Sequence, residues 1–201
     1  MCCADREQAA SLPKHYARNH MQPILDHIAS VVRPALRKYL EAESALTHAI
    51  ESTDAVLSST ARQDVMLAAR QVADVLHHLA DSALKEPSPS LAFAKIEDVR
   101  SAVAARCVFL RTPAPVADVA LLRDVADAFK HHRPDRASAT VLVSTDVVPI
   151  GSGWGQMRWG EGKYGGAEQV IVTTRDGAKR ALSSVAWMRL LGQPLPPISL
   201  Y

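Results

Sequence analysis

The sequence contains no run of apolar residues that approaches the roughly 18 needed to cross a membrane. Its start, MCCADREQAA, lacks the basic, apolar and small-residue order of a secretory signal. Cysteine is scarce: Cys2 and Cys3 are adjacent and Cys107 lies far from them, which fits neither a disulfide framework nor a zinc spacing. We therefore expect a cytoplasmic protein that does not contact membranes, with Cys107 as a small core residue.

Neither sign of charge dominates the chain. Lys and Arg number 23 and Asp and Glu number 21, so the formal net charge is only +2. A charge this small does not by itself indicate a nucleic-acid or membrane surface. With 201 residues, 48% of them hydrophobic, the composition excludes disorder and a collagen-like chain and predicts one soluble domain, with or without a small appendage.

Glycine is absent from the first 150 residues, and seven of the nine glycines fall within 151–166. Long glycine-free, alanine-rich sequence favours helices, because each interior glycine costs up to about 1 kcal/mol in backbone entropy. All three tryptophans also lie after residue 150. We expect a helical bundle over 1–136 and a small β appendage over 137–201, packed on the bundle as one unit.

Apolar residues recur at three- and four-residue intervals in the first part, the period of amphipathic helices. This pattern predicts four helices that form an antiparallel bundle. Their expected ranges are 21–50, 60–84, 91–109 and 116–132. Pro34 should kink or split the first of them, because proline lacks a backbone N–H and crowds the preceding turn.

The second part of the sequence contains strands, so the whole chain is predicted to be an α+β protein that is mostly α. Residues 139–150 and 169–174 are rich in β-branched side chains, which favours strands. Asp176-Gly177 predicts a tight turn with positive φ, followed by a short returning strand over 179–182. A short C-terminal helix should begin at Ser183 or Ser184 and end at Gly192.

The segment 151–166 lacks an apolar period, and loops of this length are functional or disordered. No helix follows its glycines to bind a pyrophosphate, which excludes a dinucleotide-binding loop. Trp154, Trp159 and Tyr164 offer flat faces while Arg158 and Lys163 offer charge, a combination that stacks bases and holds phosphates. The alternative is a flexible hairpin whose aromatic side chains pack on the sheet.

The fourth predicted helix carries a polar stripe opposite its apolar face, formed by Arg123, Asp127, Lys130 and His131. Asp127 can pair at i, i+4 with both Arg123 and His131. A carboxylate between a guanidinium and an imidazole orients the ring and raises its pKa, which suits proton transfer or phosphate binding. The alternative is a solvated face with ordinary ion pairs.

The second predicted helix places Asp74, His77, His78 and Asp81 at spacings of three and four. Metal sites in bundles generally take ligands from several helices. A set of His77, His78 and His131 is therefore the metal alternative to ordinary surface histidines, and the main expectation is that the protein uses no metal or cofactor.

Residues 122–132, LRDVADAFKHH, followed by Arg133-Pro-Asp-Arg136, resemble the late-helix signature of HEPN-like helical bundles and of related uncharacterised bacterial proteins. Active members carry an arginine, commonly followed by a polar residue, and then a histidine after four to six intervening positions. Arg123-Asp124 matches the first half, whereas His131 comes after seven. The resemblance implies a metal-independent ribonuclease that acts as a homodimer, with His131 transferring protons and Arg123 stabilising phosphate charge.

Two functions follow as expectations. The first is a HEPN-like protein that binds or cleaves RNA, with Asp127 and Lys130 near the phosphate and the aromatic loop stacking bases. The second is a non-enzymatic helical bundle for interaction or oligomerisation, in which the polar stripe is solvated.

Overall fold

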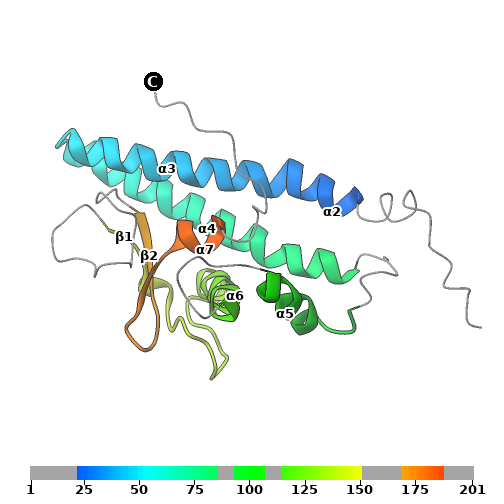
Figure 1. Ribbon diagram of the computed structural model, residues 1–201. Helices are drawn as coiled ribbons and strands as arrows, with labels where there is room; N and C mark the ends of the chain where they lie inside the picture. Colours follow the sequence, from blue (N-terminus) through cyan, green and yellow to red (C-terminus); the bar gives the residue numbers. More distant parts are fainter. Residues whose placement is uncertain (1–21, 86–92, 107–114, 151–168, 188–201) are drawn as a thin grey trace, which may run out of the picture.

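The computed structural model describes residues 22–85, 93–106, 115–150 and 169–187. Two long antiparallel helical segments form its upper layer (Figure 1). The first consists of α2 (Gln22–His27), a π-helical segment η1 (Ile28–Val32) and α3 (Arg33–Glu51). The second is the 31-residue helix α4 (Ala55–Lys85). Together they bury the apolar faces that the three- and four-residue periodicity predicts.

The π-helical segment ends at Val32, two residues before Pro34, which occupies the first turn of α3. Proline cannot donate its backbone hydrogen bond, and its ring crowds the carbonyl four residues earlier, which belongs to Ser30 within η1. Widening the turn to the π form relieves this crowding. The expected interruption at Pro34 is therefore present as a π-helical segment, and the helix continues through it.

Helix α4 begins at Ala55, five residues before the expected start at Thr60. Asp54 explains the difference: its Oδ1 atom accepts hydrogen bonds from the backbone N–H groups of Val56 (2.8 Å) and Leu57 (3.1 Å). These N–H groups have no partner within the helix, so a capping carboxylate fixes the helix start. The sequence prediction was wrong here because it relied on the apolar period, which begins later.

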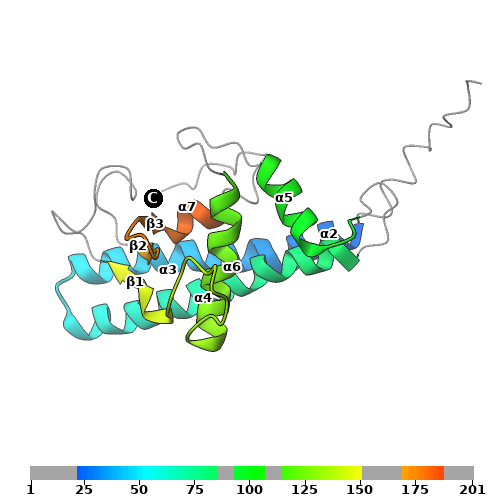
Figure 2. The same ribbon diagram turned by 90° about the horizontal axis from the view of Figure 1, so that it is seen from below.

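Helices α5 (Ile96–Arg106) and α6 (Pro115–His131) lie against α4. The expected third helix started at Leu91, but residues 93–95 are not helical. Figure 2 shows that α6 runs across the α3–α4 pair and not alongside it. Four helical segments are present as expected, and the fourth crosses the long pair.

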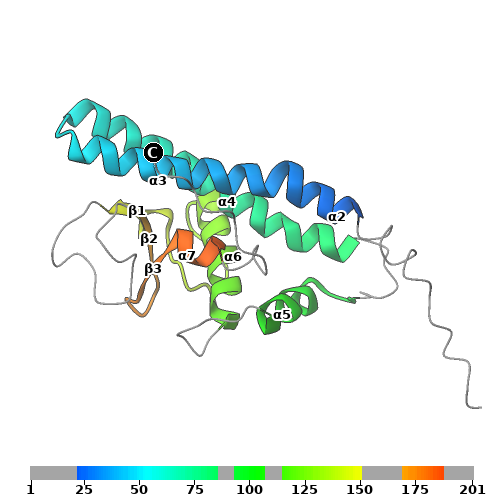
Figure 3. The same ribbon diagram turned by 45° about the horizontal axis from the view of Figure 1, so that its top comes forward.

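A three-stranded antiparallel sheet has the order β1 (Val147–Ile150), β2 (Gln169–Thr173) and β3 (Lys179–Ala181). Val147 pairs with Val172, and Ile171 pairs with Ala181. Figure 3 shows the sheet near one end of the long helices and α5 near the other, with α6 between them.

The expected strand over 139–150 is wrong in length, because only its last four residues are extended in the sheet. Asp146 Oδ2 accepts hydrogen bonds from the backbone N–H groups of Leu142 and Val143, each at 3.1 Å. A 3-10 turn (Ser144–Asp146) follows at once. These local hydrogen bonds compete with strand pairing, as is typical of Asp.

The turn before β3 agrees with the prediction in position, and Gly177 alone adopts positive φ (82°) there. The last described helix, α7 (Leu182–Trp187), begins one residue before Ser183. Its expected continuation to Gly192 lies outside the described residues, as do Cys107 and the loop 151–166.

One apolar cluster joins the helices, the sheet and α7. Leu46, Leu76, Leu122 and Leu182 are among its fully buried side chains. The predicted α+β class, mostly α, is confirmed. None of the helices in the described ranges is both long and apolar enough to span a membrane.

Candidate nucleic-acid interface

An open pocket of about 460 Å³ lies where α6 crosses α3 and α4. Three of its lining residues are cationic, one is acidic and three are apolar. The lining consists of Lys38 from α3, Leu67, Arg70, Gln71 and Asp74 from α4, and Ala126, Phe129 and Lys130 from α6. The pocket therefore combines positively charged and apolar lining residues.

Helical spacing explains why these residues share the pocket. On α4, Leu67, Arg70 and Asp74 follow one another at intervals of three and four, so they lie along one face. On α6, Ala126 and Lys130 are one turn apart and flank the same surface. The crossing of α6 over the long pair brings these two faces together.

The three pocket cations, Lys38, Arg70 and Lys130, are exposed. Among the described residues, none of the hydrogen bonds or ion pairs involves their side chains. Asp74, the acidic residue of the lining, lies 3.4 Å from His78 Nε2. The three cations outnumber this single carboxylate, which leaves the pocket lining with a formal charge of +2 (three positive and one negative).

Phe129 supplies an aromatic side chain to the pocket and is only partly buried against the core. Leu67 beside it is 63% exposed. An exposed aliphatic side chain and an aromatic ring next to three cations are suited to a ligand with both flat and anionic parts.

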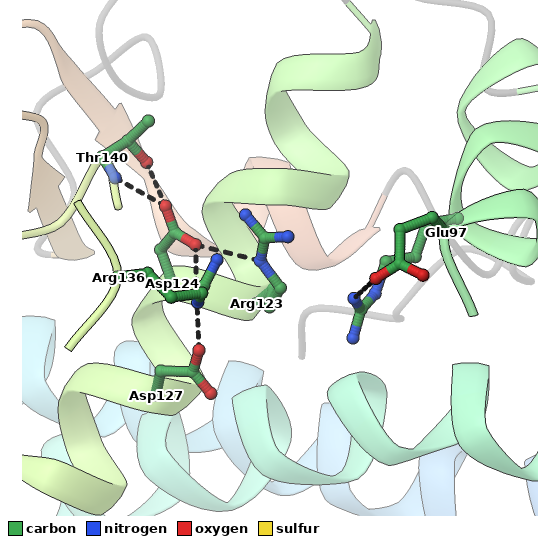
Figure 4. A network of polar contacts seen from close by, with 7 residues as sticks. Glu97, Arg123, Asp124, Asp127, Arg136 and Thr140 are labelled. Carbon is green, nitrogen blue, oxygen red and sulfur yellow. Dashed lines mark hydrogen bonds and ion pairs between the residues drawn. The ribbon is translucent and has the colours of Figure 1, made fainter. Parts of the chain in front are cut away.

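A second polar site surrounds Asp124, whose side chain is fully buried (Figure 4). Its Oδ1 atom accepts hydrogen bonds from Arg123 Nε (3.1 Å) and Arg136 Nη2 (2.9 Å). Its Oδ2 atom accepts from the backbone N–H (2.6 Å) and the hydroxyl (2.8 Å) of Thr140. Arg136 also donates to Asp127. Through these hydrogen bonds, Arg136 and Thr140 hold the segment that follows α6 against that helix.

The network holds Asp124 as a carboxylate. Burial alone would raise its pKa, but the hydrogen bonds from Thr140, Arg136 and Arg123 outweigh it, so the pKa lies below its ordinary value. For Arg136, burial lowers the pKa, while Asp124 and Asp127 raise it more strongly, and the net pKa is raised. Both charges therefore persist at neutral pH.

The pairing on α6 differs from the expected one. Arg123 pairs with its neighbour Asp124 instead of Asp127, and Asp127 pairs with Arg136. His131 is exposed, and within the described part of the chain no hydrogen bond joins it to Asp127. The expectation failed because the chain turns back after α6 and supplies Arg136, a partner that helical spacing alone does not reveal.

Arg100 adds a cation from α5 at the α5–α6 contact. Its Nη1 atom lies 3.6 Å from Glu97, and its side chain is only 15% exposed. Its pKa is lowered, first by burial and then by the positive charge of Arg123. Cations from α5 and α6 thus lie close to each other beside the Asp124 network.

His77 lies near the same junction. Burial lowers its pKa, and Arg100 adds to this effect, while the negative charge of Asp127 opposes it. His77, His78 and Asp81 form a group whose potential ligand atoms all lie within 4.8 Å of one another. His131, the third member of the expected metal alternative, is not part of that group.

The five loop residues expected to contact nucleic acid lie outside the described residues. They are Trp154, Arg158, Trp159, Lys163 and Tyr164. Of the expected helix residues, Lys130 lines the pocket, whereas Arg123 and Asp127 belong to the Asp124 network.

Sequence reasoning missed Lys38, Arg70, Arg136 and Thr140. Lys38, Arg70 and Lys130 lie on three different helices, so the spacing of residues along one helix could not show that they meet. Arg136 stood within the segment quoted for the HEPN-like resemblance, but its partners could not be read from spacing.

No family model, curated protein or solved structure matches this chain. The HEPN-like resemblance therefore stays a prediction that rests on residues 122–136.

Proposed function

We propose that the protein binds single-stranded RNA in the pocket between α3, α4 and α6. The observation that carries this proposal is the convergence of Lys38, Arg70 and Lys130 from three helices around Phe129. Phosphates would meet the cations, and a base would lie against the aromatic ring and Leu67. Proteins that bind single strands combine these two features.

The Asp124 network supports this surface indirectly. It fixes the segment 136–140 against α6 and so holds the helix that carries Phe129 and Lys130. Arg123 contacts Asp124 through Nε, which leaves its terminal nitrogens available to an anion. Contact of Arg123 with phosphate is thus compatible with its structural pairing.

Cleavage is the further step that the HEPN-like resemblance implies, with Arg123 and His131 in a homodimer. His131 is exposed at the end of α6, where a second copy or an RNA strand can reach it. We propose binding as the primary activity and make cleavage a separate readout of the same experiment.

The test measures retention of labelled single-stranded RNA by the full-length chain at low and moderate salt. We expect binding that weakens steeply with salt, because phosphate contacts release counterions. Arg70→Gln and Lys130→Gln should each weaken binding, and each should reduce the salt slope by about 0.7, the contribution of one phosphate contact in a single strand.

Arg33→Gln is the matched control. It removes one exposed positive charge from α3, five positions before Lys38, which rotates its side chain by about 140° around the helix axis from the pocket face. Equal weakening by Arg33→Gln would show a general charge effect and contradict the pocket. Absence of binding at both salts would reject the proposal and favour the interaction-bundle alternative, which sedimentation would then test as self-association.

The same incubations are scored for cleaved RNA with Arg123→Ala and His131→Ala. Loss of cleavage in both variants, with helical content unchanged by circular dichroism, would establish the ribonuclease activity. Retention of RNA without cleavage would leave a nucleic-acid-binding protein.

A further inference from the structure

Two histidines and an aspartate gather on one face near the end of α4. His77, His78 and Asp81 each offer one ligand atom, and these atoms all lie within 4.8 Å of one another. Asp81 follows the two histidines by four and three positions, so one helical turn brings its carboxylate beside both rings. The rings of His77 and His78 meet edge to face with centroids 5.3 Å apart.

We propose that His77, His78 and Asp81 form a binding site for a divalent transition-metal ion of the zinc class. Imidazole nitrogens with one carboxylate oxygen are ligands that Zn²⁺ accepts. Hard cations such as Mg²⁺ prefer oxygen ligands alone, so the two histidines select against them. Three protein ligands leave the remaining coordination positions to water or to another ligand.

The geometry around His78 fits a metal ligand with a supporting carboxylate. Its Nδ1 atom lies 3.2 Å from Asp81 Oδ2, a separation that suits two ligands of one ion. Its other nitrogen, Nε2, lies 3.4 Å from Asp74 Oδ1. Nδ1 and Asp81 Oδ2 are at hydrogen-bond distance, so a bound ion would take the place of the proton between them, and the ring proton would then lie on Nε2, which faces Asp74. Metal-bound histidines commonly have a second carboxylate in this role.

Charged groups on the neighbouring helices also act on the site, where the His77 side chain is partly buried. Asp127, whose charge acts on His77 from α6, adds negative potential at the site. Arg100 from α5 opposes it, and Arg100 is itself partly balanced by Glu97.

The experiment titrates the full-length, tag-free protein with Zn²⁺ and follows binding by calorimetry and by competition with a chromophoric chelator. We expect one ion per chain at this site. His78→Ala and Asp81→Asn should each weaken binding by at least about tenfold, since even second-shell changes cost 10–100-fold in metal affinity. Asp74→Asn should weaken it by about tenfold for the same reason.

The matched control is His48→Ala. His48 Nδ1 lies 3.5 Å from Glu51 at the same i, i+3 spacing, but without a second histidine beside it, and both side chains are exposed. It should leave zinc affinity unchanged. Equal weakening by His48→Ala would overturn the proposal, as would binding that survives His78→Ala and Asp81→Asn but disappears in a Cys2→Ser/Cys3→Ser variant. Absence of zinc binding would overturn it as well.

Discussion

At the scale of single residues, Asp124 is a fully buried carboxylate that is held by several partners. Its side chain has no solvent exposure, yet it accepts hydrogen bonds from two arginines and from both the backbone and the hydroxyl of Thr140. A buried carboxylate is tolerated only with such complete pairing. The segment after α6 is thereby fixed by one side chain.

Replacing Asp124 with Ala should lower the free energy of unfolding by about 3 kcal/mol, the lower end for breaking a buried ion pair. The lower end applies because Arg123 and Arg136 remain partly exposed and can turn to water. Urea unfolding followed by circular dichroism measures the change. Asp127→Ala is the control on the same helix: its side chain is 24% exposed and, among the described residues, pairs only with Arg136, so its loss should cost about 1 kcal/mol or less. Equal losses would contradict the assigned role of Asp124.

His77 makes stability depend on pH. Because its pKa in the folded protein lies below the ordinary value of about 6.5, the unfolded chain binds a proton more readily than the folded chain. This contribution to stability is present above pH 6.5 and is lost as the pH falls below it. We expect His77→Gln to flatten the fall in unfolding free energy between pH 7.5 and 5.5, measured by urea unfolding at each pH in metal-free buffer. Parallel curves for both proteins would contradict the expectation.

At the scale of elements, the start of α4 depends on one side chain. Asp54 caps two backbone N–H groups that the helix cannot satisfy, and the preceding Thr53 adopts positive φ (59°) to make the turn from α3. The long helical pair, which forms two sides of the basic pocket, is joined at this turn. The hydrogen bonds of one capping side chain thus help to fix how α3 and α4 are joined.

Asp54→Ala should lower stability by about 1 kcal/mol, as is typical for loss of a capping side chain. Thermal unfolding followed by circular dichroism would show the shift. Asp64→Ala removes an exposed carboxylate from the interior of the same helix and serves as its control. Its effect should stay within about 0.5 kcal/mol, and a similar loss in both variants would argue against the cap.

At the scale of the whole molecule, the two parts of the sequence share one core. Val141, Val170 and Leu182 belong to the same apolar cluster as residues of α3, α4 and α6. Glu43 adds a polar link: it is buried, accepts a hydrogen bond from Tyr39 (2.6 Å) and another from the backbone N–H of Val170 (3.2 Å). Burial, followed by the charge of Glu43, raises the pKa of Tyr39 well above its ordinary value, so the phenol stays protonated and donates.

The shared core predicts one cooperative unfolding transition. All three tryptophans lie after residue 150, so tryptophan fluorescence reports on the second part, whereas far-ultraviolet circular dichroism reports mainly on the helices before residue 132. Urea midpoints from the two probes should coincide, which is the test of two-state behaviour. A fluorescence transition at clearly lower urea would show that the two parts unfold separately.

Local sequence patterns were sufficient where a residue's structure depends on its neighbours. The apolar period located α3, α4 and α6, the β-branched run located β2, and Asp176-Gly177 located the turn before β3. These patterns were insufficient where a polar side chain binds backbone N–H groups. Because of Asp54, α4 begins earlier than the apolar period predicts, and because of Asp146, the first strand is shorter than the β-branched run predicts.

The sequence by itself determined the α+β class, the number of helical segments and the hairpin, because periodicity and turn chemistry act over a few residues. The tertiary structure decided the crossing of α6, the pairing of Asp124 with Arg136 and Thr140, and the meeting of Lys38, Arg70 and Lys130 in one pocket. These contacts join residues 12 to 92 positions apart, and such separations are set by how whole helices pack against one another, which no local pattern encodes.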